Sequence, residues 1–330
     1  MKRILFTGLA AAIVLSGCQK SDTISEMKGA QSHDHIAGRQ CASMEVLQRQ
    51  LQEDPSLQSR MDEIERQLVN NQNMMQMGRL VNGVYEIPVV VNVLYKTTAE
   101  NISLAQIQSQ IDVLNEDFGA TNADITKVPS TFTGVKAGNT NIRFVLETVN
   151  RKATTKTSWS TNDAVKKTAS GGLDPTSPTT KLNLWCCTLG NGILGYAQFP
   201  GGASATDGVV ILNKAFGSKA KCPTGYYTTT YDQGRTATHE VGHWMNLRHI
   251  WGDATCGSDL VNDTPTHNTA NYGCPASGHK STCTGTPIEM TMNYMDYTDD
   301  LCMYMFSAGQ KTRMLATFAT GGGRTTFAQP

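Results

Sequence analysis

Three histidines and one glutamate lie within eleven consecutive residues of this chain. They occur in the segment His239-Glu240-Val241-Gly242-His243-Trp244-Met245-Asn246-Leu247-Arg248-His249. Residues four apart on an α-helix lie one turn apart on the same face. A helix here therefore directs the imidazoles of His239 and His243 toward one metal ion. Glu240 would lie beside that ion, placed to hydrogen-bond a metal-bound water rather than to bind the metal.

A third ligand requires this helix to end. His249 lies six residues after His243, too far to share its face on a continuous helix, so the chain must turn back before His249 can reach the same ion. Three protein ligands leave one coordination position open, as catalytic zinc requires. A buried pair of helical histidines would explain His239 and His243 alone, and the third histidine argues against it. We predict one catalytic Zn²⁺ bound by His239, His243 and His249.

The N-terminus predicts export. Met1-Lys2-Arg3 is a cationic start, and the apolar stretch that follows, of about a dozen residues, is too short to span a bilayer stably. It ends at Leu15-Ser16-Gly17-Cys18, which resembles a bacterial lipoprotein signal. We expect residues 1–17 to be removed and Cys18 to carry a lipid that supplies membrane affinity. An ordinary secretory signal is the alternative. The expected location is the bacterial outer membrane or cell surface, or the medium after processing.

The composition limits the partners. Lys+Arg and Asp+Glu both number 28, so the chain has no basic field that would gather nucleic acid. Nine cysteines favour an exported protein. We expect protein or peptide substrates, no nucleic acid, membrane contact only through the lipid on Cys18, and a monomer.

A helical appendage precedes a larger domain. Apolar residues recur at spacings of three and four over 44–51 and 57–68, which predicts two amphipathic helices. The composition becomes β-rich at Tyr85. We therefore predict a signal peptide at 1–17, a propeptide at 18–80 and a catalytic domain at 81–330.

Several elements of the larger domain must position the metal-binding segment. Ser103 and Gln106 form a capping-box pattern before an amphipathic helix that runs to Phe118. Runs at 87–95, 142–146, 182–187 and 209–212 predict strands. Glycines and Pro200 bound a further strand, which is typical of a sheet edge. An extended peptide would pair with that edge at Gly195, Tyr196, Ala197, Gln198 and Phe199. An exposed apolar edge without this role is the alternative.

The metal-binding segment resembles the HExxHxxGxxH zinc signature of the metzincin endopeptidases, with Asn246 where metzincins usually have Gly. That position ends the helix, usually with positive φ, which Asn tolerates best after Gly. More of the chain resembles one metzincin branch, the pappalysin family, with its ulilysin-like and cytophagalysin-like members. The motifs, in family order over most of residues 85–310, are YEIPVVVNVLY, LNEDF, LNLWCC, GYAQFPGG, HEVGHW, DLVNDTP and NYMDYTDD.

This resemblance implies a fold and an activity. The fold is an α+β, metzincin-like catalytic domain: a twisted, mixed five-stranded sheet, with backing and active-site helices, over an irregular, disulfide-linked C-terminal subdomain. The activity is that of a zinc metalloendopeptidase. Met295 matches the Met-turn beneath the metal, and Tyr297 matches a tyrosine that can donate a hydrogen bond to a developing oxyanion.

The cysteines divide into three groups. The resemblance favours the disulfides Cys256–Cys283 and Cys274–Cys302; a second, structural zinc is the alternative for these four. We also predict a Cys186–Cys222 disulfide, with Cys187 in the core. Cys41 resembles a cysteine switch, in which a propeptide thiolate takes the open zinc position. An unpaired leftover cysteine is the alternative.

Some acidic residues and histidines lie outside the zinc motif. Asp259, Asp263, Thr264 and the Val261 carbonyl could supply oxygens to Ca²⁺, and a solvated acidic loop is the alternative. The other histidines lack ligand spacing, so we expect them to be solvated; they are His33, His35, His267 and His279. The apolar Leu301, expected near the pocket for the residue after the cut, argues against a basic preference.

The predicted function is that of an exported zinc endopeptidase made as a zymogen. Zinc would lower the pKa of its water, Glu240 would take the proton, and zinc with Tyr297 would stabilise the oxyanion. A non-catalytic, zinc-stabilised surface adhesin is one alternative. A zinc hydrolase of a non-protein polymer is the other.

Overall fold

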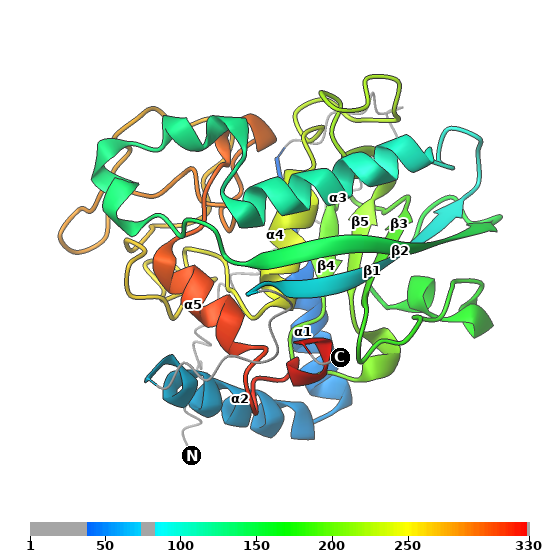
Figure 1. The fold of residues 1–330 in the computed structure, drawn as a ribbon, viewed down its shortest axis with the longest axis horizontal. Coiled ribbons are helices and arrows are strands. Elements are labelled where there is room, and N and C mark those ends of the chain that lie inside the picture. The colour runs from blue at the N-terminus through cyan, green and yellow to red at the C-terminus, as the bar shows by residue number, and fades with distance from the viewer. Residues whose placement is uncertain (1–37, 74–82, 329–330) are drawn as a thin grey trace, which may run out of the picture. The chain divides into compact units, whose positions relative to one another are not determined.

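Five strands form one mixed sheet (Figure 1). The computed structural model describes residues 38–73 and 83–328. The strands are β1 (Tyr85–Tyr95), β2 (Ile142–Ala153), β3 (Leu182–Cys187), β4 (Gly195–Ala197) and β5 (Val209–Leu212). Their order is β2-β1-β3-β5-β4; β4 lies at an edge antiparallel to β5, and the other neighbours are parallel. The predicted α+β class, the mixed five-stranded sheet and the edge strand are confirmed.

Two helices cover one face of this sheet. Helix α3 (Leu104–Gly119) packs against β2, and α4 (Arg235–Trp244) packs against β4, β5 and α3 (Figure 1). Ser103 caps α3 as predicted, because its hydroxyl accepts a hydrogen bond from the Gln106 amide, but the Gln106 side chain contacts the Phe216 and Tyr226 backbone and does not complete the predicted capping box. Side chains of the central strands alternate between a core shared with these helices and a second core on the other face. Helix α4, which carries the metal-binding segment, is therefore buried along its whole length.

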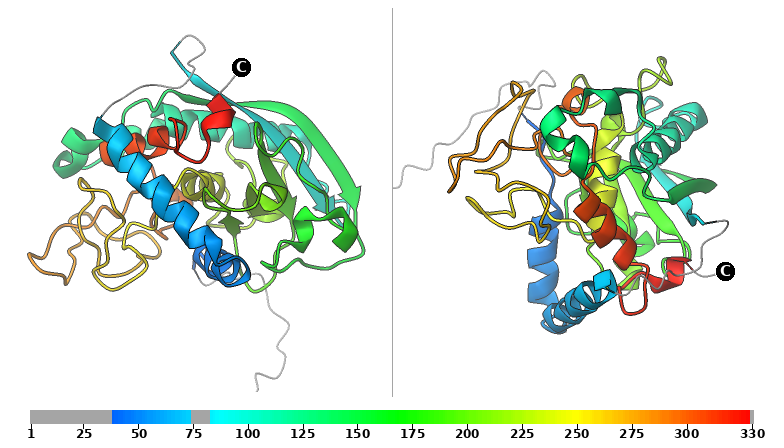
Figure 2. Two further views of the ribbon diagram at one scale, coloured as in Figure 1. Left: turned by 90° about the horizontal axis from the view of Figure 1, so that it is seen from below. Right: turned by 60° about the vertical axis from the view of Figure 1, so that its left-hand side comes forward.

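The two predicted N-terminal helices lie on the domain that follows them. Helix α1 (Ser43–Glu53) packs beside β4. Helix α2 (Ser56–Asn73) lies across α5 (Ala308–Ala316), as Figure 2 shows. Glu65 of α2 forms an ion pair of 2.6 Å with the buried guanidinium of Arg313 in α5. The helical part of the predicted propeptide is thus joined to the domain by both apolar and charged contacts.

The buried side chain of Arg324 ties the C-terminal segment to the end of α4. Its guanidinium donates hydrogen bonds to the carbonyl oxygens of Trp244 and Gln198, and it forms an ion pair with Asp207 at 2.8 Å. A buried arginine needs such partners, because an unpaired buried charge is strongly destabilising. These contacts hold the last residue of α4 close to the segment that follows the edge strand.

Two disulfides join the irregular region after α4, and they are Cys256–Cys283 and Cys274–Cys302. Both pairings are those that the resemblance favoured. The predicted Cys186–Cys222 disulfide was wrong, because both thiols are free and buried. Cys186 lies in the core on β3, which pairs with β1 on one side and β5 on the other. Cys222 lies in a turn, where its amide donates to the Ser218 carbonyl. Cys187 is a core residue, as predicted.

The N-terminal predictions fall outside the described residues. They are the signal peptide at 1–17, the lipid on Cys18 and the propeptide boundary at 80. Within the described ranges, we find no helix that is both long and apolar enough to cross a bilayer.

Candidate active site

Helix α4 carries the first half of the metal-binding segment. His239 and His243 lie one turn apart on it, and the helix ends at Trp244. Asn246 follows with a φ of 68°, so the prediction of positive φ at this position is confirmed. Asparagine accepts this left-handed conformation at little cost. The chain turns back there and brings His249 to the two helical histidines.

The three imidazoles converge on one point. The Nε2 atom of His243 lies 3.2 Å from that of His239 and 3.1 Å from that of His249. Zinc–nitrogen bonds of about 2.0–2.1 Å in tetrahedral geometry separate two ligand nitrogens by about 3.3 Å. All three side chains are buried, and burial lowers the pKa of His239 and His243 well below the usual value. The donor set therefore fits one zinc ion bound by neutral imidazoles.

A partner for each Nδ1 atom fixes the orientation of the rings. The partners are the Tyr294 carbonyl for His239 at 2.7 Å, the Leu247 carbonyl for His243 at 2.8 Å and the Asp253 carboxylate for His249 at 2.5 Å. A carbonyl oxygen can only accept, so Nδ1 of the two helical histidines carries the proton. The Nε2 lone pairs are thereby left for a metal. Asp253 was not identified from the sequence.

Glu240 lies beside this cluster and is buried. Burial raises the pKa of its carboxyl to about 7, although hydrogen bonds from Ser43 and Cys41 act in the opposite direction. The edge strand approaches it closely at Gly195, where a Cβ atom would lie 2.8 Å from Glu240 Cγ. Only glycine permits this approach, so the sheet edge and the carboxylate border the same space.

Met295 and Tyr297 lie under and beside the cluster. A Cβ atom on Gly242 would lie 2.5 Å from the sulfur of Met295, so this helical glycine lets the thioether pack against α4. The Tyr297 ring lies 4.9 Å from the His249 ring and 5.7 Å from the His239 ring. Burial raises the pKa of the Tyr297 hydroxyl far above its usual value, which keeps it a hydrogen-bond donor.

Cys41 joins the three histidines, and their potential ligand atoms all lie within 4.8 Å of one another. Its backbone pairs with the edge strand, parallel to it, next to Gly195. The Tyr297 hydroxyl donates to the Cys41 carbonyl at 3.1 Å. Burial and the neighbouring Glu240 raise the pKa of the Cys41 thiol well above its usual value. The thiol therefore needs a bound cation to lose its proton.

Ser43 is a site residue that the sequence analysis missed. Its hydroxyl donates a hydrogen bond to Glu240 Oε2 at 2.8 Å and accepts one from the Ala197 amide, also at 2.8 Å. The Ser43 hydroxyl thus forms hydrogen bonds both with the carboxylate beside the metal position and with a backbone donor of the edge strand. Ser43 immediately follows two residues that pair with the strand, a contact that only the fold reveals.

Arg39 is buried beside the cluster. Its guanidinium contacts the Asp300 carboxylate at 2.5 Å and donates to the Thr298 carbonyl and the Thr236 hydroxyl, each at 3.2 Å. Arg39 and Asp300 are almost fully buried. Leu301, predicted to lie near a substrate pocket, is 56% exposed, and its neighbour Asp300 binds Arg39 instead. This pair was missed because its members lie 261 positions apart.

The predicted substrate-binding segment contains a short strand and two following residues. Gly195, Tyr196 and Ala197 form β4, whereas Gln198 and Phe199 follow it. All five are buried, partly beneath α1. The Phe199 ring lies 5.4 Å from the His243 ring, so the segment runs from the Glu240 side of the cluster to the His243 side.

The residues predicted for calcium have partners within the protein. Asp259 accepts hydrogen bonds from the Thr264 hydroxyl, at 2.9 and 3.0 Å, and from the Val261 amide. Asp263 accepts from the Ser307 hydroxyl and the Gly309 amide at the start of α5. Burial raises the pKa of Asp259 to about 6. Calcium binding by these residues stays a prediction.

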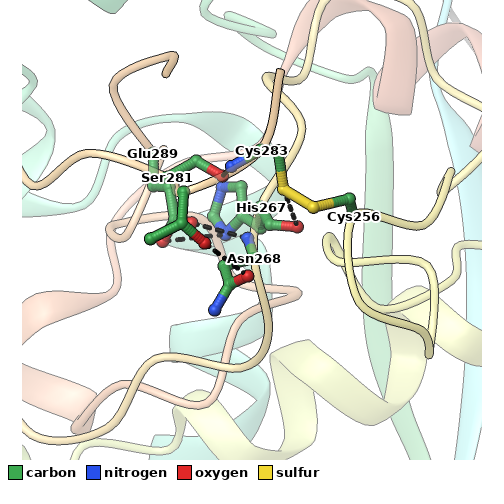
Figure 3. The surroundings of a disulfide bond; sticks show 7 residues. Cys256, His267, Asn268, Ser281, Cys283 and Glu289 are labelled. Atoms are coloured by element: carbon green, nitrogen blue, oxygen red, sulfur yellow. Dashed lines mark hydrogen bonds and ion pairs between the residues drawn. A yellow bond between two sulfur atoms is a disulfide. The ribbon is translucent and has the colours of Figure 1, made fainter. Parts of the chain in front are cut away.

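The expectation for His267 was wrong. This histidine is fully buried beside the Cys256–Cys283 disulfide (Figure 3). The His279 side chain, in contrast, is 46% exposed, as expected. The Met290 amide donates to His267 Nε2 at 3.0 Å. His33 and His35 lie outside the described residues. Ligand spacing cannot reveal a histidine whose partners are backbone groups and carboxylates far along the chain.

Comparison with known proteins identifies the family. The profile of Peptidase_M43, described as pregnancy-associated plasma protein-A, matches residues 192–319. An extracellular metalloprotease of Verticillium alfalfae is 33% identical over 242 residues, which are 69% of this chain and 77% of that protein. The chain belongs to the pappalysin family. Another extracellular metalloprotease, from Pyricularia oryzae, is 35% identical over 67% of this pappalysin and 70% of its own length.

Solved structures agree with this assignment. A mutant of Tannerella forsythia promirolysin is 40% identical, with a TM-score of 0.76 over 88% of this pappalysin and 97% of that chain. Mature mirolysin from the same organism, in complex with a cleaved peptide, is 45% identical, with a TM-score of 0.69 over 74% of this chain and 95% of its own. Together with the histidine cluster, these matches make the protein a zinc metalloendopeptidase of the pappalysin type.

Proposed function

We propose that this pappalysin is made as an exported zymogen and that it cleaves peptide bonds with Glu240 as general base. The observation that carries the proposal is the convergence of three Nε2 atoms, with the buried Glu240 carboxylate beside them. Zinc bound at His239, His243 and His249 would activate a water and polarise the scissile carbonyl.

The residues around the metal position have separate roles in this proposal. Glu240 takes the proton of the attacking water and passes it to the leaving amine. The Tyr297 hydroxyl donates a hydrogen bond to the oxyanion. The substrate backbone pairs with the edge strand at 195–199, from which the Ser43 hydroxyl has first to withdraw.

Latency follows from the contacts of the N-terminal segment. Cys41 takes the open zinc position, Ser43 holds Glu240, and the Cys41 backbone holds Tyr297. The match to promirolysin covers more of this chain than the match to mature mirolysin, which supports a removable segment. We place the propeptide at 18–80 and the catalytic domain at 81–330.

The remaining parts of the proposal concern location and a second ion. Lipidation of Cys18 after removal of residues 1–17 would place the enzyme on the outer membrane or cell surface, and further processing would release it. The names of the extracellular relatives support export. Asp259, Val261, Asp263 and Thr264 would bind calcium. We expect the enzyme to act as a monomer.

Metal removal tests the proposed function. After removal of the propeptide, the protein should cleave casein and short peptides, and a chelator should abolish cleavage because the imidazoles alone cannot activate water. Stoichiometric zinc should restore the rate, measured by mass spectrometry of the products and by elemental analysis. Cleavage that survives when zinc is shown to be absent would contradict the proposal, as would exclusive hydrolysis of a non-protein polymer.

We expect the active enzyme to prefer a substrate with a basic side chain next to the scissile bond, because Asp300 pairs with the guanidinium of Arg39 here. When Arg39 is removed with the propeptide, Asp300 Oδ1 loses its cation, while Asp300 Oδ2 still accepts from the Gln233 and Arg235 amides. Replacing Asp300 with Asn keeps an acceptor for these amides and removes the charge. We expect kcat/KM for arginine-containing peptides to fall by about 10- to 100-fold, the value of a hydrogen bond to a charged group.

A peptide library cut by the wild-type enzyme and by Asp300→Asn measures this preference. Peptides with a neutral residue in the same place serve as the control and should change little. An equal loss for both peptide classes would assign Asp300 a structural role instead.

A further inference from the structure

Two buried carboxylates, those of Glu289 and Asp296, lie close together in the irregular region near the Met-turn. Both residues are at most 3% exposed. Amides supply the short hydrogen bonds to them, whereas the nearest imidazole nitrogens, of His267 and His279, lie 3.5–3.8 Å away. Asn271 supplies the link: its Nδ2 atom donates to Glu289 Oε2 at 2.7 Å and to Asp296 Oδ2 at 3.0 Å. An amide nitrogen has two hydrogens, so both are used here.

The second oxygen of Asp296 holds the backbone of Tyr297. Asp296 Oδ1 accepts hydrogen bonds from the Tyr297 amide and the Asn271 amide, each at 2.8 Å. Asn271 therefore contacts this carboxylate twice, once through its side chain and once through its backbone. Whatever fixes the Asp296 carboxylate also fixes the start of Tyr297, whose ring lies against two of the zinc-binding histidines.

His267 and the neighbouring disulfide hold the other side of this polar cluster. His267 Nε2 accepts the Met290 amide, so in the neutral ring the proton is on Nδ1, which lies 3.5 Å from Asp296 Oδ2. The His267 carbonyl lies 3.5 Å from the sulfur of Cys283, next to its disulfide with Cys256 (Figure 3). The cluster thus lies between a covalent cross-link on one side and Tyr297 on the other.

We propose that Asn271 is a positioning residue for catalysis: by bridging Glu289 and Asp296, it holds Tyr297 where its hydroxyl can reach the oxyanion. This inference rests on the role of Tyr297 in the proposed function. Asn271 does not touch the reacting atoms. Its effect follows from geometry, since a misplacement of about 1 Å can cost about 100-fold in rate.

The test begins with Asn271→Ala in the full chain. This change removes the amide that bridges the two buried carboxylates and leaves between them the His267 imidazole, whose Nδ1 atom lies 3.5 Å from Asp296 Oδ2 and 3.8 Å from Glu289 Oε2. After activation, we expect kcat to fall by about 10- to 100-fold with a smaller change in KM and with unchanged zinc content. Thr282→Val is the matched control, because it removes an exposed hydrogen bond to Asn268 in the same region and should retain wild-type kcat. Asp296→Asn breaks the Nδ2 bridge without a cavity and provides a second variant if Asn271→Ala folds poorly.

Combination with Tyr297→Phe separates positioning from a general structural role. If Asn271 acts through Tyr297, the double variant should be hardly slower than Tyr297→Phe alone. Losses that multiply in the double variant would overturn the proposal.

Hydrogen exchange of the uncleaved chain gives a readout that does not depend on activity. The Tyr297 amide should exchange at least about tenfold faster in Asn271→Ala, whereas peptides from α3 should not change. An unchanged Tyr297 amide would overturn the positioning claim. An inactive wild-type enzyme, in contrast, would count against the proposed function while leaving this exchange result valid.

Discussion

Replacing Glu240 with alanine is expected to lower peptide turnover by about 10²–10⁴-fold, the usual contribution of a general base. Glu240 is buried beside the three imidazoles, and burial raises its pKa to about 7. Zinc content should not change, because the ring orientations depend on Tyr294, Leu247 and Asp253 rather than on Glu240. Product analysis by mass spectrometry, with elemental analysis of the same sample, measures both quantities.

Glu116→Ala is a suitable control for this variant. Glu116 lies on α3, and its carboxylate pairs with Lys221 at the surface, so its loss should leave both turnover and zinc unchanged. Turnover at the wild-type rate in Glu240→Ala would exclude Glu240 as the base. Loss of zinc from the variant would show instead that the carboxylate helps to retain the metal.

The second large effect is expected from Cys41→Ala, which should give the uncleaved chain measurable peptidase activity. The change removes the only sulfur among the four potential ligands and frees the open zinc position. Adding Ser43→Ala should raise the rate by a further 10-fold or so, because a hydrogen bond to a charged carboxylate contributes about 1.5–3 kcal/mol. Initial rates have to be measured while electrophoresis still shows the chain intact.

Residual inhibition should persist in both variants, since Arg39 still pairs with Asp300 and Glu65 still pairs with Arg313. Cys222→Ser serves as the thiol control, because Cys222 is also unpaired and lies outside the zinc cluster. An intact Cys41→Ala chain as inactive as the wild type, but active after removal of the propeptide, would show that Cys41 is not required for latency.

Short-range spacing explains most of what the sequence could predict. The histidine spacing placed two ligands on one helix face, and the resemblance to metzincins predicted the positive φ at Asn246 that brings in the third. Strand positions followed from apolar runs. The prediction missed the end of β2, which extends to Ala153, because the last residues of this strand are at most partly buried and do not form such a run.

Contacts between distant residues were beyond such reasoning. The sequence around Arg39 and around Asp300 carries no motif that would link the two residues, and only the fold brings their side chains together. His267 carries no spacing signal because its partners belong to a segment more than twenty residues away. The Cys186–Cys222 prediction counted unpaired thiols without knowing that β3 lies between two strands, which keeps Cys186 in the core.

The two disulfides after α4 also bear on the compartment in which the enzyme can become active. They cross-link the strand-poor region that carries Tyr297, and such bonds form in oxidising compartments but rarely in the cytosol. In a reducing environment these two bonds would not form, and the region that carries Tyr297 would lack both cross-links. If the chain is exported as we propose, this region would become cross-linked only after it has left the cytosol, which would add a second control to the proposed propeptide.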